Sequence, residues 1–339
     1  MKLVVRTADW ESDNLALLKL LQEQLSPSID RRRFDWLYRL CPAGEAKVWV
    51  AVDPNTGKLA GAAAAFPRKI VIGGHVQTGC VFGDFCVSPE HRSLGPAIQL
   101  QRKCLDTVMN GEFAAAYDLP SASMLAVYRR LGATPGGQLV RMTMLLRSNA
   151  KIAAQVKPKL FAQGLSLAAN AVLSLKRGSL RSRTGATVEK HTGRFGSEFT
   201  DLAMRIGGDL GNCVERSAEY LNWRYADHPQ QQYEVVTARQ RGLLEGYVIF
   251  QLKDTNASVV DWLGDSADLR ADLIRGLMSA LPSNGCEAIH VPVLTSHMFS
   301  DELIALGFRA RESSPVVFVG SESKQTNAAW LLLDGDRES

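Results

Sequence analysis

The sequence predicts an α/β protein built from two domains of similar organisation, and three observations point to it. The chain has 339 residues, about the length of two average domains. Its content of 46% hydrophobic and 22% charged residues is typical of a soluble globular protein. A series of short sequence features also recurs, in the same order, in the second half of the chain.

The repeat is weak at each position but consistent along the chain. An aromatic pair followed by a proline opens each half, and two strand-like runs and a Leu-Gly pair follow in both. Because the order is kept throughout, chance is a poor explanation for the series. The matched segments are Trp36-Leu37-Tyr38 with Pro42 and Trp223-Arg224-Tyr225 with Pro229, residues 48–51 and 235–238, residues 57–62 and 242–247, and residues 131–133 and 306–308.

The first half begins with an antiparallel meander of predicted strands, residues 48–51, 57–62 and 80–87. A tight turn follows, and then residues 98–109 have helical periodicity. Backbone N–H groups at the start of a helix lack partners within it, and the helix dipole favours negative charge there. Gly95 permits close approach of an anion, and Pro96 suits the first helical turn. The turn fits a diphosphate, although an ordinary strand–turn–helix connection would show the same residues.

Two segments of the first half resemble a known family. Arg92-x-x-Gly95-x-Ala97, after Val87-x-Pro89-Glu90, resembles the pyrophosphate loop of the GCN5-related N-acetyltransferase (GNAT) superfamily. Downstream, a predicted buried strand at 115–119 and a helix at 123–133 ending at a glycine resemble that family's fifth strand and fourth helix. The resemblance covers residues 1–147 and implies an acyl-CoA-binding domain. It also implies that each domain is a mixed, mostly antiparallel sheet flanked by helices.

The second half, residues 187–325, is predicted to be a degenerate copy. Where the first half has its glycine-containing loop, the second has Gly264 followed by Asp265 and Asp268, whose charges would repel a diphosphate. The position that matches Tyr128 is Leu303. We expect this domain to keep the fold without binding CoA, and to shape the acceptor site or pack against the first domain.

The remaining segments are a basic linker and a tail. Residues 119–188 contain no acidic residue and carry a charge of +11 within a chain of net charge +4, which suggests an anionic partner. Residues 148–186 read as a basic helical linker that is buried between the domains, docks an acidic carrier protein or lies on an anionic membrane surface. Residues 326–339 are expected to be a loosely held C-terminal tail.

Composition also indicates where the protein works. No stretch reaches the roughly 18 apolar residues of a membrane span, and the amino terminus turns polar too soon for a signal peptide. The six cysteines are scattered, which favours a reducing compartment. We expect a cytoplasmic protein, or one peripheral at the inner membrane face. Since the six histidines do not cluster, no metal site is expected.

The resemblance implies acetyl-CoA or another acyl-CoA as cosubstrate and assigns roles at the site. Tyr128 matches the family's thiolate-facing tyrosine and would act as the acid, although its spacing also fits a core aromatic. Asp84 is the first candidate for the base, or an ordinary strand carboxylate, and Asp118 is the reserve. The acyl group would lie on the strand end Phe85, Cys86 and Val87. The predicted CoA contacts are Arg92, Ser93, Leu94, Gly95, Pro96, Ala97 and Ser121, the last where the family often has an asparagine.

Three departures from the family pattern leave the donor open. Pro96 removes one amide from the loop, Ser121 replaces asparagine, and Gly132-Ala133 replaces Gly-Phe. They would suit weaker acetyl-CoA binding, a longer acyl group or an acyl carrier protein as donor.

The first hypothesis is an N-acyltransferase acting on an amine, such as an amino sugar or a cell-surface polysaccharide precursor. The alternative from another class is a non-catalytic GNAT-like binding or scaffold protein. A Fem-type aminoacyl transferase shares the duplicated fold but would not need the loop at 92–97. Nucleic-acid binding is disfavoured because the basic block holds only two aromatic residues, Tyr128 and Phe161.

Overall fold

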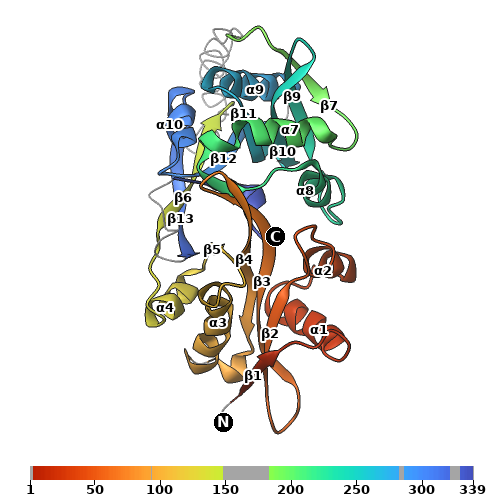
Figure 1. The fold of residues 1–339 in the computed structure, drawn as a ribbon, viewed down its shortest axis with the longest axis vertical. Coiled ribbons are helices and arrows are strands. Elements are labelled where there is room, and N and C mark those ends of the chain that lie inside the picture. Colours follow the sequence, from red (N-terminus) through yellow and green to blue (C-terminus); the bar gives the residue numbers. More distant parts are fainter. Residues whose placement is uncertain (1–2, 93, 148–182, 282–285, 321–328, 339) are drawn as a thin grey trace, which may run out of the picture.

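A computed structural model describes residues 3–92, 94–147, 183–281, 286–320 and 329–338. It confirms the mixed α/β class, with a mostly antiparallel central sheet flanked by helices (Figure 1). The first half comprises β1 (Val4–Thr7), α1 (Asn14–Gln24), α2 (Arg31–Tyr38), β2 (Lys47–Val52), β3 (Leu59–Ile72), β4 (His75–Val87), the short 3-10 turn η1 (Pro89–His91), α3 (Leu94–Met109), β5 (Ala115–Asp118), α4 (Ala122–Arg130) and β6 (Gly137–Leu145).

The second half repeats this order with some changes. It comprises β7 (Thr187–His191), α7 (Ser197–Ile206), η2 (Gly207–Leu210), β8 (Asn212–Val214), α8 (Ala218–Leu221), the π-helical turn η3 (Asn222–Ala226), β9 (Glu234–Gln240), β10 (Leu243–Lys253), β11 (Asn256–Gly264), α9 (Ala267–Ala280), β12 (Ala288–Leu294), α10 (Met298–Ala305), β13 (Arg309–Gly320), β14 (Trp330–Leu331) and η4 (Asp334–Asp336).

Helices cover both faces of the first-half sheet (Figure 1). Because successive strand side chains point to opposite faces, alternate residues of β2 enter different cores. Val48 and Val50 belong to the cluster that includes α1 and α2. Trp49 and Ala51 pack in a second cluster with Leu100 and other side chains of α3. Both faces of β2 and β3 are therefore buried. The same helix α3 also packs on β4.

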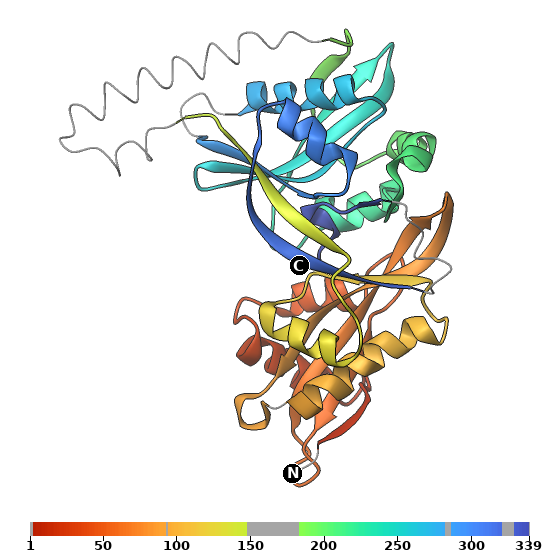
Figure 2. The same cartoon turned by 90° about the vertical axis from the view of Figure 1, so that its left-hand side faces the viewer.

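Strands β6 and β13 each lie in the sheet of the other half. β6 pairs antiparallel with β12, and β13 pairs antiparallel with β5. β6 and β13 also pair with each other and so join the halves into one 14-stranded sheet. Figure 2 shows these two strands crossing between the halves. A boundary at residue 147 leaves β6 with the first-half strands and consequently separates it from its pairing partners β12 and β13, although the division into two domains stays a prediction about folding units.

The repeated aromatic segments meet at the junction of the two halves. The indole rings of Trp36 and Trp223 stack with centroids 4.8 Å apart. Each Nε1 donates to the backbone oxygen of the other residue, at 2.8 Å from Trp36 and 3.1 Å from Trp223. Both side chains are buried. This reciprocal contact relates the two halves by an approximate two-fold axis and agrees with the sequence repeat.

The expectation of a loosely held C-terminal tail is wrong for residues 329–338. The apolar run Leu331–Leu333 is buried, and β14 adds to β8 as a parallel strand. Asp336 is also buried, where its carboxylate binds Arg216, and its backbone oxygen accepts a 2.6 Å hydrogen bond from Tyr117. Burial of these three leucines, with the partly buried Trp330 packed against the same cluster, gives this segment its own share of the core. The C-terminus therefore lies between the two halves (Figure 1).

Most of the predicted basic linker, residues 148–182, lies outside the described residues. Its last residues are anchored on α9, where the Asp272 carboxylate accepts from the backbone N–H groups of Arg183 and Thr184. None of the described helices is both long enough and apolar enough to cross a membrane. All six cysteines lie within the described residues; they are buried, and none forms a disulfide.

Candidate functional site

The site begins at an irregularity in β4. Between its pairs with Ala62 and Ala64 of β3, β4 carries one extra residue, because Cys86 and Gly83 are their partners. Asp84 lies in this bulge with φ +43°, a backbone conformation that few non-glycine residues adopt. The bulge turns Phe85, Cys86 and Val87 toward the start of α3.

β4 and β5 diverge next to the bulge. Among the described residues the two parallel strands share two residue pairs, Cys80 with Ala116 and Val81 with Tyr117. Beyond these pairs, β4 continues for six residues to Val87 while β5 ends at Asp118. Backbone groups of the β4 end that face β5 are therefore not used in a β-ladder there, and strands that open in this way leave room for a ligand.

A cavity of about 560 Å³ lies at this opening. It is bordered by the end of β4, the starts of α3 and α4 and the end of α1. Of the predicted contacts, it is lined by Phe85, Cys86, Val87, Arg92, Ala97 and Ser121. Its other lining residues, which the sequence analysis did not single out, are Gln24, Leu25, Ser123, Met124 and Val127.

Gly95 and Pro96 are not among the residues that line the cavity, although Arg92 before them and Ala97 after them are. Gly95 and Pro96 are in the first turn of α3, and a Cβ atom at Gly95 would meet no atom within 4 Å. Ser93 lies outside the described residues, and nothing is described of the Leu94 side chain. Arg92 is exposed, and its Nε donates to the backbone oxygen of Val87 at 3.3 Å. The 16-residue helix α3 thus begins next to a guanidinium group.

Ser121, predicted as a CoA contact, is the N-cap of α4. Its side-chain oxygen accepts from the backbone N–H of Met124 at 3.3 Å. This cap fixes the start of α4 at the cavity wall. It also sets the phase of the helix, which carries Tyr128 inward.

Tyr128 and Asp118 are in direct contact. The Tyr128 hydroxyl donates to Asp118 Oδ2 at 2.5 Å, and Gln101 Nε2 of α3 donates to the Tyr128 oxygen at 2.8 Å. Burial raises the pKa of Asp118 to about 7, although the hydrogen bond from Tyr128 acts in the opposite direction. Burial and the Asp118 charge raise the pKa of the Tyr128 hydroxyl well above its ordinary value. A carboxyl that titrates near neutral pH can take up and give back a proton.

Asp84 makes contacts that its sequence position could not reveal. Its Oδ2 accepts from the Tyr38 hydroxyl at 2.8 Å and lies 3.6 Å from Arg33 Nη1. Both partners belong to α2, and all three side chains are largely buried. Burial, together with the Asp84 charge, raises the pKa of the Tyr38 hydroxyl well above its ordinary value. These contacts give Asp84 a role in holding the bulge against α2.

Glu338, close to the C-terminus, is the site residue that the sequence analysis missed. A Cβ atom added to Gly83 would lie 2.5 Å from Glu338 Cγ, so the glutamate side chain packs on the backbone just before the bulge. Burial raises the pKa of Glu338, and the nearby Asp84 charge adds to this. Its own charge contributes to the raised pKa of Asp118. An acidic residue near a chain end carries no signal by itself, because only the buried path of residues 329–337 brings it here.

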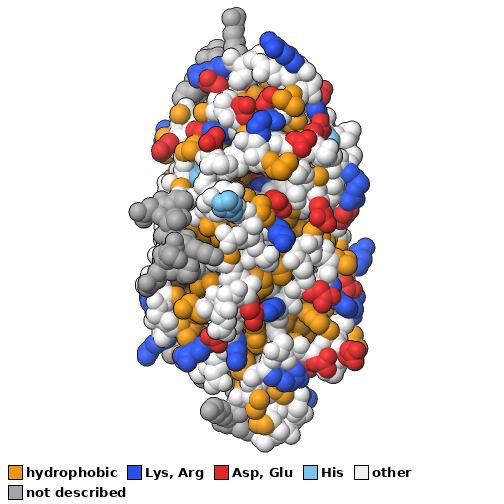
Figure 3. Space-filling view, viewed as in Figure 1, with side chains coloured by type: hydrophobic (Ala, Val, Ile, Leu, Met, Phe, Trp, Pro, Cys, Tyr) orange, Lys and Arg blue, Asp and Glu red, His pale blue; other side chains and the backbone are white. Residues whose placement is uncertain are grey.

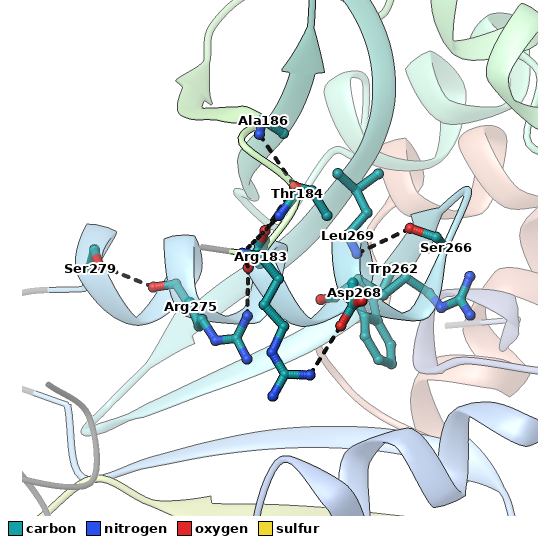
Figure 4. A network of polar contacts seen from close by, with 11 residues as sticks. Arg183, Thr184, Ala186, Trp262, Ser266, Asp268, Leu269, Arg275 and Ser279 are labelled. Atoms are coloured by element: carbon teal, nitrogen blue, oxygen red, sulfur yellow. Dashed lines mark hydrogen bonds and ion pairs between the residues drawn. The ribbon is translucent and has the colours of Figure 1, made fainter. Parts of the chain in front are cut away.

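The corresponding turn of the second half differs (Figure 4). After β11, the side chain of Ser266 caps α9 by accepting from the N–H of Leu269. Arg270 folds back over the turn, and its Nη1 donates to the Gly264 oxygen at 2.6 Å. Asp268 pairs with Arg183, and Leu303 is buried on α10. The turn therefore presents an acidic side chain and a covered backbone instead of open amides.

Among the residues that the structure describes, no group of His, Cys, Asp and Glu side chains is placed to hold a metal ion. The arrangement instead joins an opened strand end, a helix start beside an arginine, and a buried tyrosine–carboxyl pair. Such a site can bind an anionic ligand and move protons at neutral pH.

Comparison with known proteins agrees with this geometry. Residues 13–136 match the family model described as the acetyltransferase (GNAT) domain. No curated protein sequence matches the chain. Three similar solved structures are a probable N-acyltransferase from Enterococcus faecalis (15% identity, TM-score 0.67, covering 94% of this chain and 72% of that one), a GCN5-related N-acetyltransferase from Anabaena variabilis (14%, 0.65, 94% and 72%) and the N-myristoyltransferase of Saccharomyces cerevisiae with bound myristoyl-CoA (14%, 0.58, 94% and 79%).

At these identities the structural likeness establishes the fold, which extends over nearly the whole chain. The family match adds the first-half segment that contains β4, α3, β5 and α4, the elements that border the cavity. Residues 13–136 of this chain therefore match the acetyltransferase (GNAT) domain in sequence, and the chain shares the fold of solved GCN5-related N-acetyltransferases.

Proposed function

We propose that this protein is an N-acyltransferase that moves an acyl group, most simply acetyl, from an acyl-CoA to an amine acceptor. The observation that carries the proposal is the cavity between the end of β4 and the starts of α3 and α4. The helix α4 that lines it with Met124 and Val127 also carries Tyr128, which is hydrogen-bonded to Asp118. The family match and the myristoyl-CoA bound to the yeast neighbour support a CoA thioester as donor.

The donor would lie along the cavity with its diphosphate at the start of α3. Unpaired helix amides and the dipole favour negative charge there, and Arg92 adds a cation. The acyl carbonyl would lie against the backbone of Phe85–Val87, where amides not used in the sheet can stabilise the developing oxyanion. The apolar lining by Phe85, Val127 and Met124 leaves acyl groups longer than acetyl as further candidates.

The amine must lose a proton as it attacks, and the departing thiolate must gain one. We assign the acid to Tyr128. For the base we place Asp118 first, because it contacts Tyr128 and its pKa is raised to about 7 by burial. Asp84 becomes the second candidate, since its carboxylate already binds Tyr38 and faces Arg33.

The acceptor and any partner are the least constrained part of the proposal. We propose a primary amine, such as an amino sugar or a polysaccharide precursor, with the second half shaping its site. Lys, Arg, Asp and Glu side chains are interspersed over the described face in Figure 3, so that face does not favour an anionic partner. An acidic carrier protein or membrane surface would instead meet the basic segment, of which 148–182 lie outside the described residues.

Changing Gly95 to glutamate is expected to weaken acetyl-CoA binding roughly tenfold or more, because a carboxylate at the helix start opposes the diphosphate. The open space around Gly95 means that the side chain itself is tolerated. Isothermal calorimetry with acetyl-CoA measures the affinity, and we expect micromolar binding to the unchanged protein.

Gly95→Gln is the matched control, since it has the same shape without the charge and should retain most of the affinity. If the unchanged protein binds no acetyl-CoA, the proposal fails and a non-catalytic role is favoured. A panel of hexosamines, polyamines and lysine, analysed by mass spectrometry after incubation with acetyl-CoA, then identifies the class of amine.

Changing Glu338 to glutamine is expected to lower the pKa of Asp118 below about 7, because a neighbouring negative charge disfavours its ionised form. If Asp118 is the base, the acidic inflection of kcat/KM should move to lower pH by roughly half a unit. The profile is measured with the fastest amine of the panel. Asp334→Asn, in the same segment but paired with Arg337 at the surface, should leave the inflection in place. An unmoved inflection in Glu338→Gln would contradict the electrostatic link between Glu338 and Asp118.

A further inference from the structure

The Tyr128 hydroxyl is held from two sides in a way that restricts its proton. Gln101 and Tyr128 are almost fully buried, and they come from α3 and α4. Gln101 Nε2 donates to the hydroxyl oxygen at 2.8 Å, and the hydroxyl donates to Asp118 Oδ2 at 2.5 Å. The three side chains form a continuous hydrogen-bonded chain, Gln101–Tyr128–Asp118. They are not among the residues that line the cavity, whose α4 wall is formed by the neighbouring Met124 and Val127.

The protonation state of Asp118 decides whether Tyr128 can donate its proton to another group. A tyrosine hydroxyl has one proton to donate, and an ionised carboxylate only accepts. As long as Asp118 is ionised, the Tyr128 proton is committed to it. When Asp118 is protonated, its own O–H can donate to Tyr128, and the tyrosine proton is released for another acceptor.

We propose that Asp118 and Tyr128 form one proton relay, in which the proton taken from the amine is the one that Asp118 returns through Tyr128 to the leaving sulfur. This inference rests on the proposed acyl transfer and adds that the base and the acid are coupled. Gln101 is a positioning residue, because it fixes the tyrosine oxygen toward Asp118 and donates to that oxygen throughout.

The step balances without any further reagent. The amine nitrogen forms a bond to the acyl carbon, and its excess proton moves to Asp118. The carbon–sulfur bond breaks with its electron pair on sulfur. The sulfur then takes the hydroxyl proton of Tyr128, and Tyr128 takes the proton of Asp118. The products are an amide and free CoA thiol, and both side chains return to their starting states.

The surroundings of Asp118 favour an exchangeable proton. Tyr128 faces it from α4, Glu338 from the C-terminal segment and the Cys104 thiol from α3, while Val317 of β13 is its strand partner. No cation is among these neighbours in the described part of the chain. Burial therefore raises the pKa of Asp118 to about 7, so both protonation states are populated at neutral pH.

A double-mutant cycle on kcat tests the coupling. With acetyl-CoA and the fastest amine of the panel, Asp118→Asn and Tyr128→Phe should each lower kcat roughly 100-fold. If the two residues pass a single proton, the double variant should be no more than about twofold slower than the slower single variant. Independent roles would multiply to roughly 10⁴-fold, and that result would overturn the relay.

Two further measurements separate this from a structural effect. The inflection of kcat near pH 7 should be absent from Asp118→Asn, and Gln101→Leu should lower kcat only several-fold at unchanged acetyl-CoA affinity. Tyr233→Phe, a half-buried tyrosine of the second half, is the control for loss of a hydroxyl and should keep the wild-type rate. If acetyl transfer is retained but the effects of the two substitutions on kcat multiply, the relay alone is rejected. If the protein does not bind acetyl-CoA, the proposed function itself is rejected.

Discussion

Changing Asp336 to alanine is expected to lower the free energy of unfolding by about 3 to 5 kcal/mol. Its carboxylate oxygens accept from Arg216 Nη2 at 2.9 and 2.7 Å, and both side chains are 1% exposed. Burial opposes the charged form of Arg216, but Asp261 and Asp336 outweigh it and hold the pKa of the guanidinium well above its ordinary value. Without Asp336 the buried cation would keep a hydrogen bond to the backbone oxygen of Val214, and its charge would be balanced by the more distant Asp261 carboxylate, at 3.4 Å.

Urea unfolding followed by tryptophan fluorescence measures this change. Asp334→Ala is the matched control two residues earlier, since its half-exposed carboxylate pairs with Arg337 and should contribute less than about 1 kcal/mol. Equal losses in the two variants would show that Arg216 does not depend on Asp336. The loss should also extend to catalysis, because the same segment carries Glu338 to the site.

Changing Trp36 to alanine is expected to cost about 3 to 5 kcal/mol of stability, because a large buried ring leaves a cavity at the junction of the halves. The change also removes the 2.8 Å hydrogen bond to the Trp223 oxygen and the ring over which the Arg224 guanidinium lies. Trp223→Ala should cost about as much, since its contacts mirror those of Trp36.

The double variant tests whether the two rings act as a unit. Its loss of stability should be smaller than the sum of the single losses by about 0.5 to 3 kcal/mol. Trp10→Ala serves as a control, because Trp10 is only half-buried and contacts aromatic rings of the first half. Strictly additive losses for Trp36 and Trp223 would contradict the reciprocal contact.

The parts of the site that could be predicted are those determined by local sequence. The Gly95-Pro96 helix start, the cap at Ser121 and the inward position of Tyr128 depend on residues a few positions apart, and the structure has all three in those places. Whether they bind a cofactor stays a prediction. The repeat of Trp36 and Trp223 likewise predicted two halves of similar organisation, because each tryptophan lies in a helical segment that precedes a pair of strands, Trp36 in α2 and Trp223 in η3.

The parts that could not be predicted depend on contacts between distant segments. Asp84 is placed by a bulge and by two side chains of α2, and no spacing in the sequence joins them. Glu338 reaches the site because the segment before it is held in the core. There the backbone oxygen of Asp336 accepts a hydrogen bond from Tyr117, which lies 219 positions earlier in the sequence. The composition of residues 326–339 suggested a solvated tail, because the single apolar run at Trp330–Leu333 was outweighed by its polar neighbours.

The exchange of β6 and β13 has a consequence for biosynthesis. β5, which ends beside the catalytic candidates, acquires its outer neighbour from a segment translated near the end of the chain. While the ribosome is still producing the second half, the edge of β5 stays open to solvent and to other nascent chains. Contacts between such distant segments also slow folding. The sheet of the first half should therefore be complete only after β13 has been synthesised and has paired with β5.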